Sequence, residues 1–162
     1  MPNSEPTSRP DLSPPPLPNV RVVVRPPKPR SAPSGVVADL EDLKSIAHNC
    51  RAVRQRDAIY LYFNALHHTV WKWEQADKVQ ASLYECLDTL QRPIRLTYGE
   101  AYSILIHCTC PEVDDKTRSK WARALRYAGE HKRNDETVAK FIKRKGGINA
   151  CTALYARLQR RP

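Results

Sequence analysis

The chain has 162 residues, a formal net charge of +10 and five cysteines. This length allows one domain, or two very small ones with a tail. An odd cysteine count without a visible signal peptide predicts reduced thiols in a cytoplasmic protein, which would be nucleoid-associated in a bacterium. No run of apolar residues reaches the roughly 18 that a membrane span needs.

Residues 1–35 hold eleven of the fourteen prolines. The runs "SPPPLP" and "RPPKPR" favour extended polyproline II conformations, which have no internal hydrogen bonds and no core to pack against. The sequence therefore predicts a disordered, basic N-terminal tail. Between the two runs, "VRVVVR" could form a short strand that adds to the sheet edge of a partner.

Residues 36–111 form a nearly neutral middle section in which we expect four helices. Apolar side chains at three- and four-residue intervals define one helical face in its first part, namely Val36, Leu40, Leu43, Ala47, Cys50 and Val53. The next run carries a heptad seam of Ile59, Phe63, Leu66, Val70 and Trp73. Since a helix layer of this size offers few neighbours to cover the seam, we expect a homodimer through residues 57–91.

Residues that stop or cap a helix delimit the third and fourth helices of this section. Leu83 and Cys86 lie on the apolar side of the third helix, which stops before Pro93. The following "YSILIHCTC" is rich in strand-forming residues. A capping box of Thr97 and Glu100 favours a helix there instead.

Residues 112–162 carry fourteen basic and six acidic side chains and predict three helices. Asp114-Asp115 is expected to cap the first helix, whose apolar face holds Trp121, Leu125 and Ala128, with Arg118, Arg126 and Lys132 pointing away. Asn134 or Asp135 is expected to cap the second helix, where Val138, Phe141 and Ile142 are buried.

Gly146-Gly147 separates the second of these helices from the third. Glycine adopts left-handed conformations without steric cost, so two glycines between amphipathic helices predict a tight turn and a helix-turn-helix layout. The last helix would begin at Ile148 and bury Ile148, Cys151, Leu154, Tyr155 and Leu158. Its outward positions would be Asn149, Thr152, Ala153, Ala156 and Arg160.

The charge and the turn together favour a nucleic-acid contact in this section. The expected contact residues are Lys140, Lys143, Arg144, Lys145, Asn149, Thr152, Arg157, Arg160 and Arg161. The basic residues around the turn would meet phosphates, and asparagine, threonine and arginine on the last helix would meet base edges. The alternative is an ordinary helical hairpin with a solvated basic face.

Two other groups of residues carry side chains that can bind metals or stack. His48, Cys50, His107, Cys108 and Cys110 are zinc-type ligands, but Cys-x-Cys is tighter than the usual spacing, so we expect buried thiols and no metal. His67 and Trp71 are four residues apart and can stack. No phosphate-binding glycine loop and no nucleophile paired with a base occur, so we expect neither an enzyme nor a cofactor.

The sequence thus predicts an all-α fold with a disordered tail and a basic three-helix end. The expected function is DNA binding without catalysis, in gene regulation or maintenance of a mobile element, with DNA favoured over RNA. The alternative is an adaptor, chaperone or effector that binds proteins through its aromatic middle helices and its proline-rich tail.

Overall fold

The computed structural model describes residues 35–53, 57–90 and 101–160, and within these ranges its regular structure is entirely α-helical. The helices are α1 (Val36–Ala52), α2 (Ala58–Gln75), α3 (Val79–Leu90), α4 (Ala101–Thr109), α5 (Asp115–His131), α6 (Val138–Arg144) and α7 (Ile148–Gln159). The predicted all-α class is confirmed, including a helix rather than a strand at α4. The proline-rich tail and the capping box of Thr97 and Glu100 fall outside the described residues.

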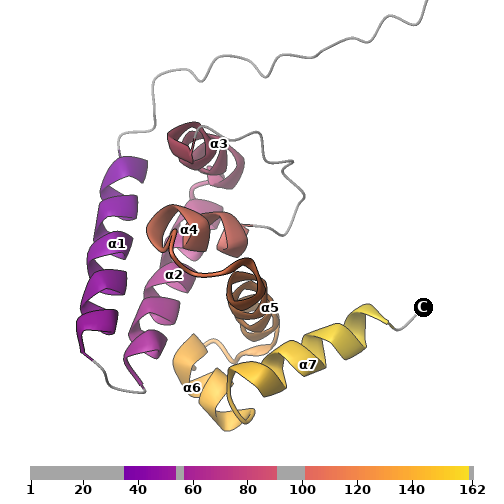
Figure 1. Ribbon diagram of the computed structural model, residues 1–162. Helices are drawn as coiled ribbons and strands as arrows, with labels where there is room; N and C mark the ends of the chain where they lie inside the picture. Colours follow the sequence, from indigo (N-terminus) through magenta and orange to yellow (C-terminus); the bar gives the residue numbers. More distant parts are fainter. Residues whose placement is uncertain (1–34, 54–56, 91–100, 161–162) are drawn as a thin grey trace, which may run out of the picture.

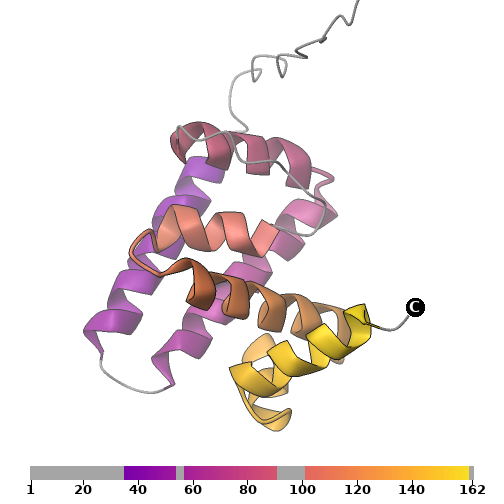
Figure 2. The ribbon, with the colours of Figure 1, turned by 45° about the vertical axis from the view of Figure 1, so that its right-hand side comes forward.

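Two antiparallel helices, α1 and α2, lie side by side, and α3, α4, α5 and α6 pack against this pair (Figure 1). Helices α3, α4 and α5 cross this pair one after another, which the rotated view shows clearly (Figure 2). Helix α6 packs on α2, and α7 lies along α5. The end of α7 therefore projects from the body of the molecule at the side opposite α1 (Figure 1).

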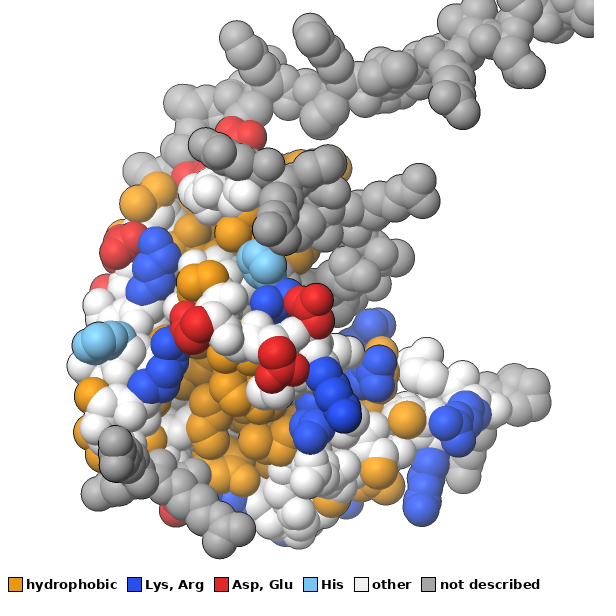
Figure 3. Space-filling model, viewed as in Figure 1, with side chains coloured by type: hydrophobic (Ala, Val, Ile, Leu, Met, Phe, Trp, Pro, Cys, Tyr) orange, Lys and Arg blue, Asp and Glu red, His pale blue; other side chains and the backbone are white. Residues whose placement is uncertain are grey.

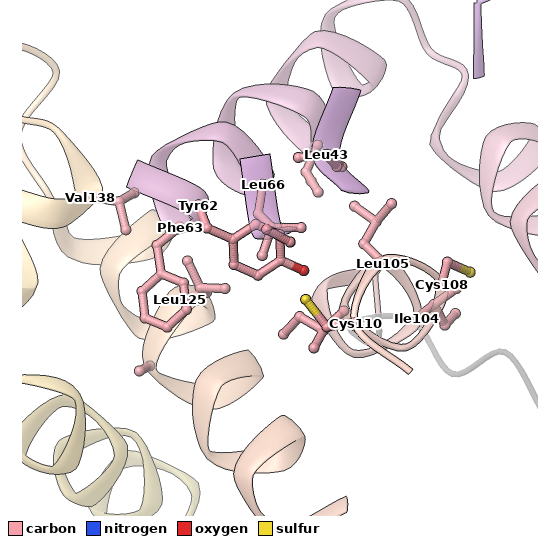
Figure 4. Close-up of a cluster of buried hydrophobic side chains, with 14 of the residues drawn as sticks. Leu43, Tyr62, Phe63, Leu66, Ile104, Leu105, Cys108, Cys110, Leu125 and Val138 are labelled. Carbon is pink, nitrogen blue, oxygen red and sulfur yellow. The ribbon is translucent and has the colours of Figure 1, made fainter. Parts of the chain in front are cut away.

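The core lies where α4 and α5 meet the α1–α2 pair (Figure 4). Each of these helices contributes residues from one face, such as Leu43, Phe63, Leu105 and Leu125, and all four are almost fully buried. Tyr62 brings a hydroxyl into this apolar region, 2.6 Å from Thr109 Oγ1. Because Thr109 donates its own proton to the Leu105 carbonyl, Tyr62 donates to Thr109. Burial raises the pKa of Tyr62, so the phenol stays protonated.

The heptad seam of α2 is part of this core. Phe63, Leu66, Val70 and Trp73 are buried within the single chain, and Ile59 is partly buried against them. The seam therefore needs no second copy to cover it, and the observation that suggested a homodimer is accounted for by packing inside the monomer.

The buried cluster is continuous from Val36 in α1 to Cys151 in α7. It crosses position 111/112, where the charge of the sequence changes. Side-chain bonds also join distant helices: Asp39 of α1 accepts from the Trp73 indole at 2.9 Å and pairs with Lys72 on α2. Arg51 of α1 pairs with Glu112, just before α5.

The helix caps agree with the sequence in one case and differ in another. Asp114 caps α5 as predicted, with its carboxylate accepting from the Thr117 amide at 2.9 Å. The cap of α6 is Thr137, whose hydroxyl accepts from the Lys140 amide at 3.3 Å, so the prediction of Asn134 or Asp135 was wrong. Those two residues lie in the turn before the helix, where the Glu136 amide donates to the Arg133 carbonyl.

Candidate nucleic-acid interface

The turn between α6 and α7 is built by the two glycines. The Gly147 amide donates to the Ile142 carbonyl at 2.8 Å, and the Gly146 amide donates to the Lys143 carbonyl at 3.1 Å. This pair of bonds is a Schellman motif, which satisfies the free carbonyls at the end of α6. Gly146 has a φ of 96° and Gly147 a φ of 95° with ψ of −175°, a combination that only glycine adopts readily.

The two glycines resist substitution for different reasons. A Cβ on Gly146 would lie 3.3 Å from the Cβ of Ala150, in the first turn of α7, whereas a Cβ on Gly147 would meet no atom within 4 Å. The backbone conformation therefore disfavours any other residue at both positions, and at Gly146 a side chain would also make a close contact with Ala150. Together they let α7 start immediately after α6 and leave in a different direction (Figure 1).

Helix α7 contacts the rest of the molecule along one face. Cys151 is fully buried, and Ile148, Leu154 and Tyr155 are partly buried against the core. Leu158, which was expected to be buried, is exposed because α7 extends beyond the helices that it packs against. The opposite face is exposed and carries Asn149, Ala153, Arg157 and Arg160.

Two α7 positions that were expected to point outward do not. The Thr152 hydroxyl lies against α5, 3.1 Å from the Lys120 carbonyl and 2.9 Å from the Ile148 carbonyl. Ala156 is half-buried. Thr152 therefore helps to attach α7 to α5, and the outward face is narrower than the sequence suggested.

Two of the expected phosphate-binding residues are already held in ion pairs. Lys143 pairs with Asp57 at 2.9 Å and lies 4.8 Å from the centre of the Tyr60 ring. Arg144 makes two parallel bonds to Glu136, at 2.9 and 2.8 Å, and thereby lowers the pKa of that carboxyl. Both basic side chains remain half-exposed, but each would have to share its charge with an internal partner.

Of the other expected contact residues, Lys140, Lys145, Arg157 and Arg160 are exposed. Lys145 lies over the Phe141 ring at 5.7 Å. No ion pair of these four occurs among the described residues. Arg161 lies outside the described residues. The structure thus brings Asn149, Arg157 and Arg160 together on one helix face, with Lys140 and Lys145 on the preceding helix and turn.

Lysine and arginine side chains gather along the part of the surface formed by α5 and α7 (Figure 3). Helix α5 contributes Lys116 and Arg123, which are exposed, and Arg126, which lies 5.6 Å from the Tyr155 ring of α7. Arg118 was expected to point away from the core, but its side chain is only 12% exposed and donates to the Val113 carbonyl at 2.9 Å. It therefore supports the start of α5.

The aromatic and histidine side chains of α2 pair differently from the expectation. His67 stacks on Tyr102 and bonds to its hydroxyl at 2.8 Å, while His68, not His67, lies near Trp71. Burial, with Lys132 and His68 nearby, lowers the pKa of His67 to about 4. At neutral pH the ring is uncharged. Tyr102 could not be predicted as the partner of His67 from spacing, because the two residues lie on different helices.

All five cysteines are free thiols. Cys86, Cys108, Cys110 and Cys151 are buried, and Cys50 donates to the Ala58 carbonyl at 2.9 Å. Burial raises the pKa of Cys151, which keeps that thiol protonated. Within the described residues, no three histidine, cysteine, aspartate or glutamate side chains converge in a way that could hold a metal ion.

None of the described helices is both long enough and apolar enough to cross a membrane. Comparison of the chain with models of protein families, with curated proteins and with solved structures found no match.

Proposed function

We propose that this chain is a non-enzymatic DNA-binding protein, a regulator or a maintenance factor of a mobile element, in which α7 enters the major groove. The observation that carries the proposal is the exposed face of α7, where Asn149, Ala153, Arg157 and Arg160 follow one another after the glycine turn. Along a helix this row is about 16 Å long. The major groove, about 12 Å wide, admits a helix.

Each side chain on this face suits a particular part of the duplex. Asparagine pairs with adenine and arginine with guanine through two hydrogen bonds each, and alanine lets the helix approach closely. Lys140 and Lys145, before α7, would lie beside the phosphate backbone and position the helix without reading sequence. The ion pairs of Lys143 and Arg144 make these two residues weaker candidates for phosphate contacts than the sequence suggested.

The test is duplex binding over a salt series, measured by fluorescence anisotropy on a duplex selected from a randomised pool and on a scrambled duplex. Lys145→Ala should weaken binding to both duplexes and lower the salt slope by about one. Asn149→Ala and Arg157→Ala should instead reduce the preference for the selected duplex, by about 1–3 kcal/mol for each base contact. Lys78→Ala, an exposed lysine at the α2–α3 turn, is the matched control and should change neither.

The proposal fails if the wild-type protein shows no salt-dependent affinity for any duplex. If Lys145→Ala and Asn149→Ala have the same effect on both duplexes, binding is only electrostatic and α7 does not read sequence. The proposal does not require a dimer, although two copies would be needed to fill the two halves of a palindromic site.

A second candidate function, binding to another protein, is favoured by a groove between α1, α2 and α6. The groove has a volume of about 680 Å³, and its lining includes Ile46, Val53, Tyr60 and Leu61. Leu61, in the first turn of α2, is 66% exposed, and Val53 beside it in the groove lining is 48% exposed, so two apolar side chains face solvent there. A separate hollow of about 360 Å³ lies among α1, α2, α5 and α7, and Cys110 and Val113 are part of its lining. A protein without affinity for any duplex would leave this candidate as the better one.

A further inference from the structure

An open cavity of about 560 Å³ lies between α2 and the segment that joins α5 to α6. Its walls include Asn64, His67, His68, Trp71, Lys132 and Asn134. The volume falls within the range of about 300–1,000 Å³ that is usual for small-ligand sites. None of these residues belongs to the exposed face of α7, so the cavity is distinct from the proposed duplex contact.

The cavity has an aromatic wall that the fold does not need. Trp71 is 49% exposed, whereas Trp73, two residues later, is 4% exposed and part of the core. The ring of His68 lies 5.8 Å from that of Trp71, tilted by 40°. An indole left half in water beside a cavity offers a flat apolar surface on which a planar ligand can stack.

The charge of the cavity is positive. Glu136, the acidic residue in its lining, is neutralised by its two bonds to Arg144. The Lys132 ammonium makes one long bond, 3.5 Å, to the carbonyl of the neighbouring Arg133. His67 is neutral at pH 7, since its pKa is lowered to about 4. Lys132 is therefore the cation that an anionic ligand would meet.

Positive charge also continues out of the cavity. Arg133 follows Lys132 and is exposed, and Lys140 lies on α6 just after the lining residues Thr137 and Val138. A stacking surface beside a cationic path is the arrangement by which proteins hold unpaired nucleic acid strands. Amide and hydroxyl side chains in the lining, such as Asn134 and Thr137, can bond to the edge of a base.

We propose that this cavity holds one unstacked base of a single-stranded nucleic acid, with the base on Trp71 and the adjoining phosphate beside Lys132. The site goes beyond the proposed duplex contact and does not depend on α7.

The test compares two strands of equal length, a deoxythymidine 12-mer and a 12-mer with the same sugar-phosphate backbone but no bases. The full-length protein should bind the base-containing strand about tenfold more tightly, a difference typical of one base stacked on an aromatic side chain. Trp71→Ala should abolish this difference, and Trp71→Phe should retain most of it. Tyr84→Ala is the matched control, because Tyr84 on α3 is 50% exposed and is not part of the cavity.

Two further measurements complete the test. Lys132→Ala should weaken binding of both strands, because it removes the phosphate contact. Thymidine 5′-monophosphate lacks the neighbouring phosphates and should bind about a hundredfold more weakly than the strand. Equal affinity of the wild-type protein for the two strands would overturn the proposal, as would an unchanged preference in Trp71→Ala. A mononucleotide that binds as tightly as the strand would overturn the assignment to a strand.

The duplex and single-strand proposals can fail separately. Arg160→Ala should leave the tenfold preference for the base-containing strand unchanged, whatever its effect on duplex binding. A loss of that preference in Arg160→Ala would show that the base is held by α7 and not by the cavity.

Discussion

At the scale of single residues, two helix ends in this molecule use the same hydrogen bonds with different amino acids. At the end of α6 the left-handed position is Gly146. At the end of α2 it is Asp77, with a φ of 51°, whose amide donates to the Glu74 carbonyl while the Lys78 amide donates to the Trp73 carbonyl at 2.9 Å. Aspartate tolerates this conformation better than most residues, but glycine adopts it without steric cost.

Asp77→Gly should therefore stabilise the protein, by about 0.5–1 kcal/mol, because relief of the left-handed strain outweighs the greater freedom of glycine in the unfolded chain. Urea unfolding followed by circular dichroism measures the change. Asp88→Gly, in the ordered part of α3, is the comparison and should not stabilise, because it places glycine in a helix. A lower unfolding midpoint for Asp77→Gly would show that the aspartate makes a contribution of its own.

Single positions were the least predictable part of the candidate interface. The sequence correctly indicated that the two glycines end one helix and that the next begins at Ile148. It could not indicate that Thr152 bonds to the Lys120 carbonyl, or that Arg144 is held by Glu136. These contacts depend on how α7 and the α5–α6 turn are placed in space, and spacing along one helix carries no information about it.

At the scale of helices, α6 is the element that depends most on its neighbours. It has only seven residues, too few to be stable alone, yet it precedes the proposed recognition helix. Besides its own cap Thr137, it is capped from outside: the Asn64 side chain of α2 accepts from the Ala139 amide at 2.9 Å. Two backbone amides at the start of α6 therefore donate to side chains, one to Thr137 just before the helix and one to Asn64 of α2.

Asn64→Ala should destabilise the protein by about 1–2 kcal/mol, the usual cost of losing a helix cap. Asn64→Asp, which keeps an oxygen acceptor near the positive end of α6, should restore most of that loss. Chemical unfolding gives the free-energy change, and hydrogen exchange at the Ala139 amide gives its location. If Asn64→Ala is destabilising but exchange at Ala139 is unchanged, the loss arises elsewhere in the α2 packing.

Helix faces were predicted well, and for a physical reason. Burial repeats every three or four residues in any helix that packs on a core, so Leu40, Leu43 and Ala47 in α1 could be assigned from the sequence alone. The same periodicity does not say which element covers a face. The apolar seam of α2 is equally compatible with packing against a second copy and with packing against α4 and α5. Only the three-dimensional arrangement distinguishes a homodimer from packing within one chain.

At the scale of the whole molecule, the buried cluster links the neutral middle section with the basic end. Phe63 of α2 packs edge-on against Trp121 of α5 at 5.5 Å, and α6 packs on α2. Trp121, which was expected on the apolar face of α5, is partly buried and packs against this shared core. If one section unfolded alone, the apolar side chains of the other section at this contact would be exposed to water, which is unfavourable.

The two sections should therefore unfold together. Two double variants each keep a single tryptophan as a fluorescent probe. Trp71→Phe/Trp121→Phe keeps Trp73 in the middle section, and Trp71→Phe/Trp73→Phe keeps Trp121 in the basic end. Within each variant, the urea midpoint from fluorescence should equal the midpoint from circular dichroism, as expected for a two-state transition. Midpoints that differ within one variant would show two independently folded domains, divided near residue 111.

The bond from Asn64 to the Ala139 amide also has a consequence for synthesis of the chain. The two positions are 75 residues apart, and a ribosome that adds about 5–20 residues per second needs about 4–15 s to travel between them. During that interval α2 has been made but α6 has not, so the part of α2 that α6 covers is exposed. The nascent chain thus carries an uncovered apolar surface for seconds, long enough for a general chaperone to bind before the last two helices emerge.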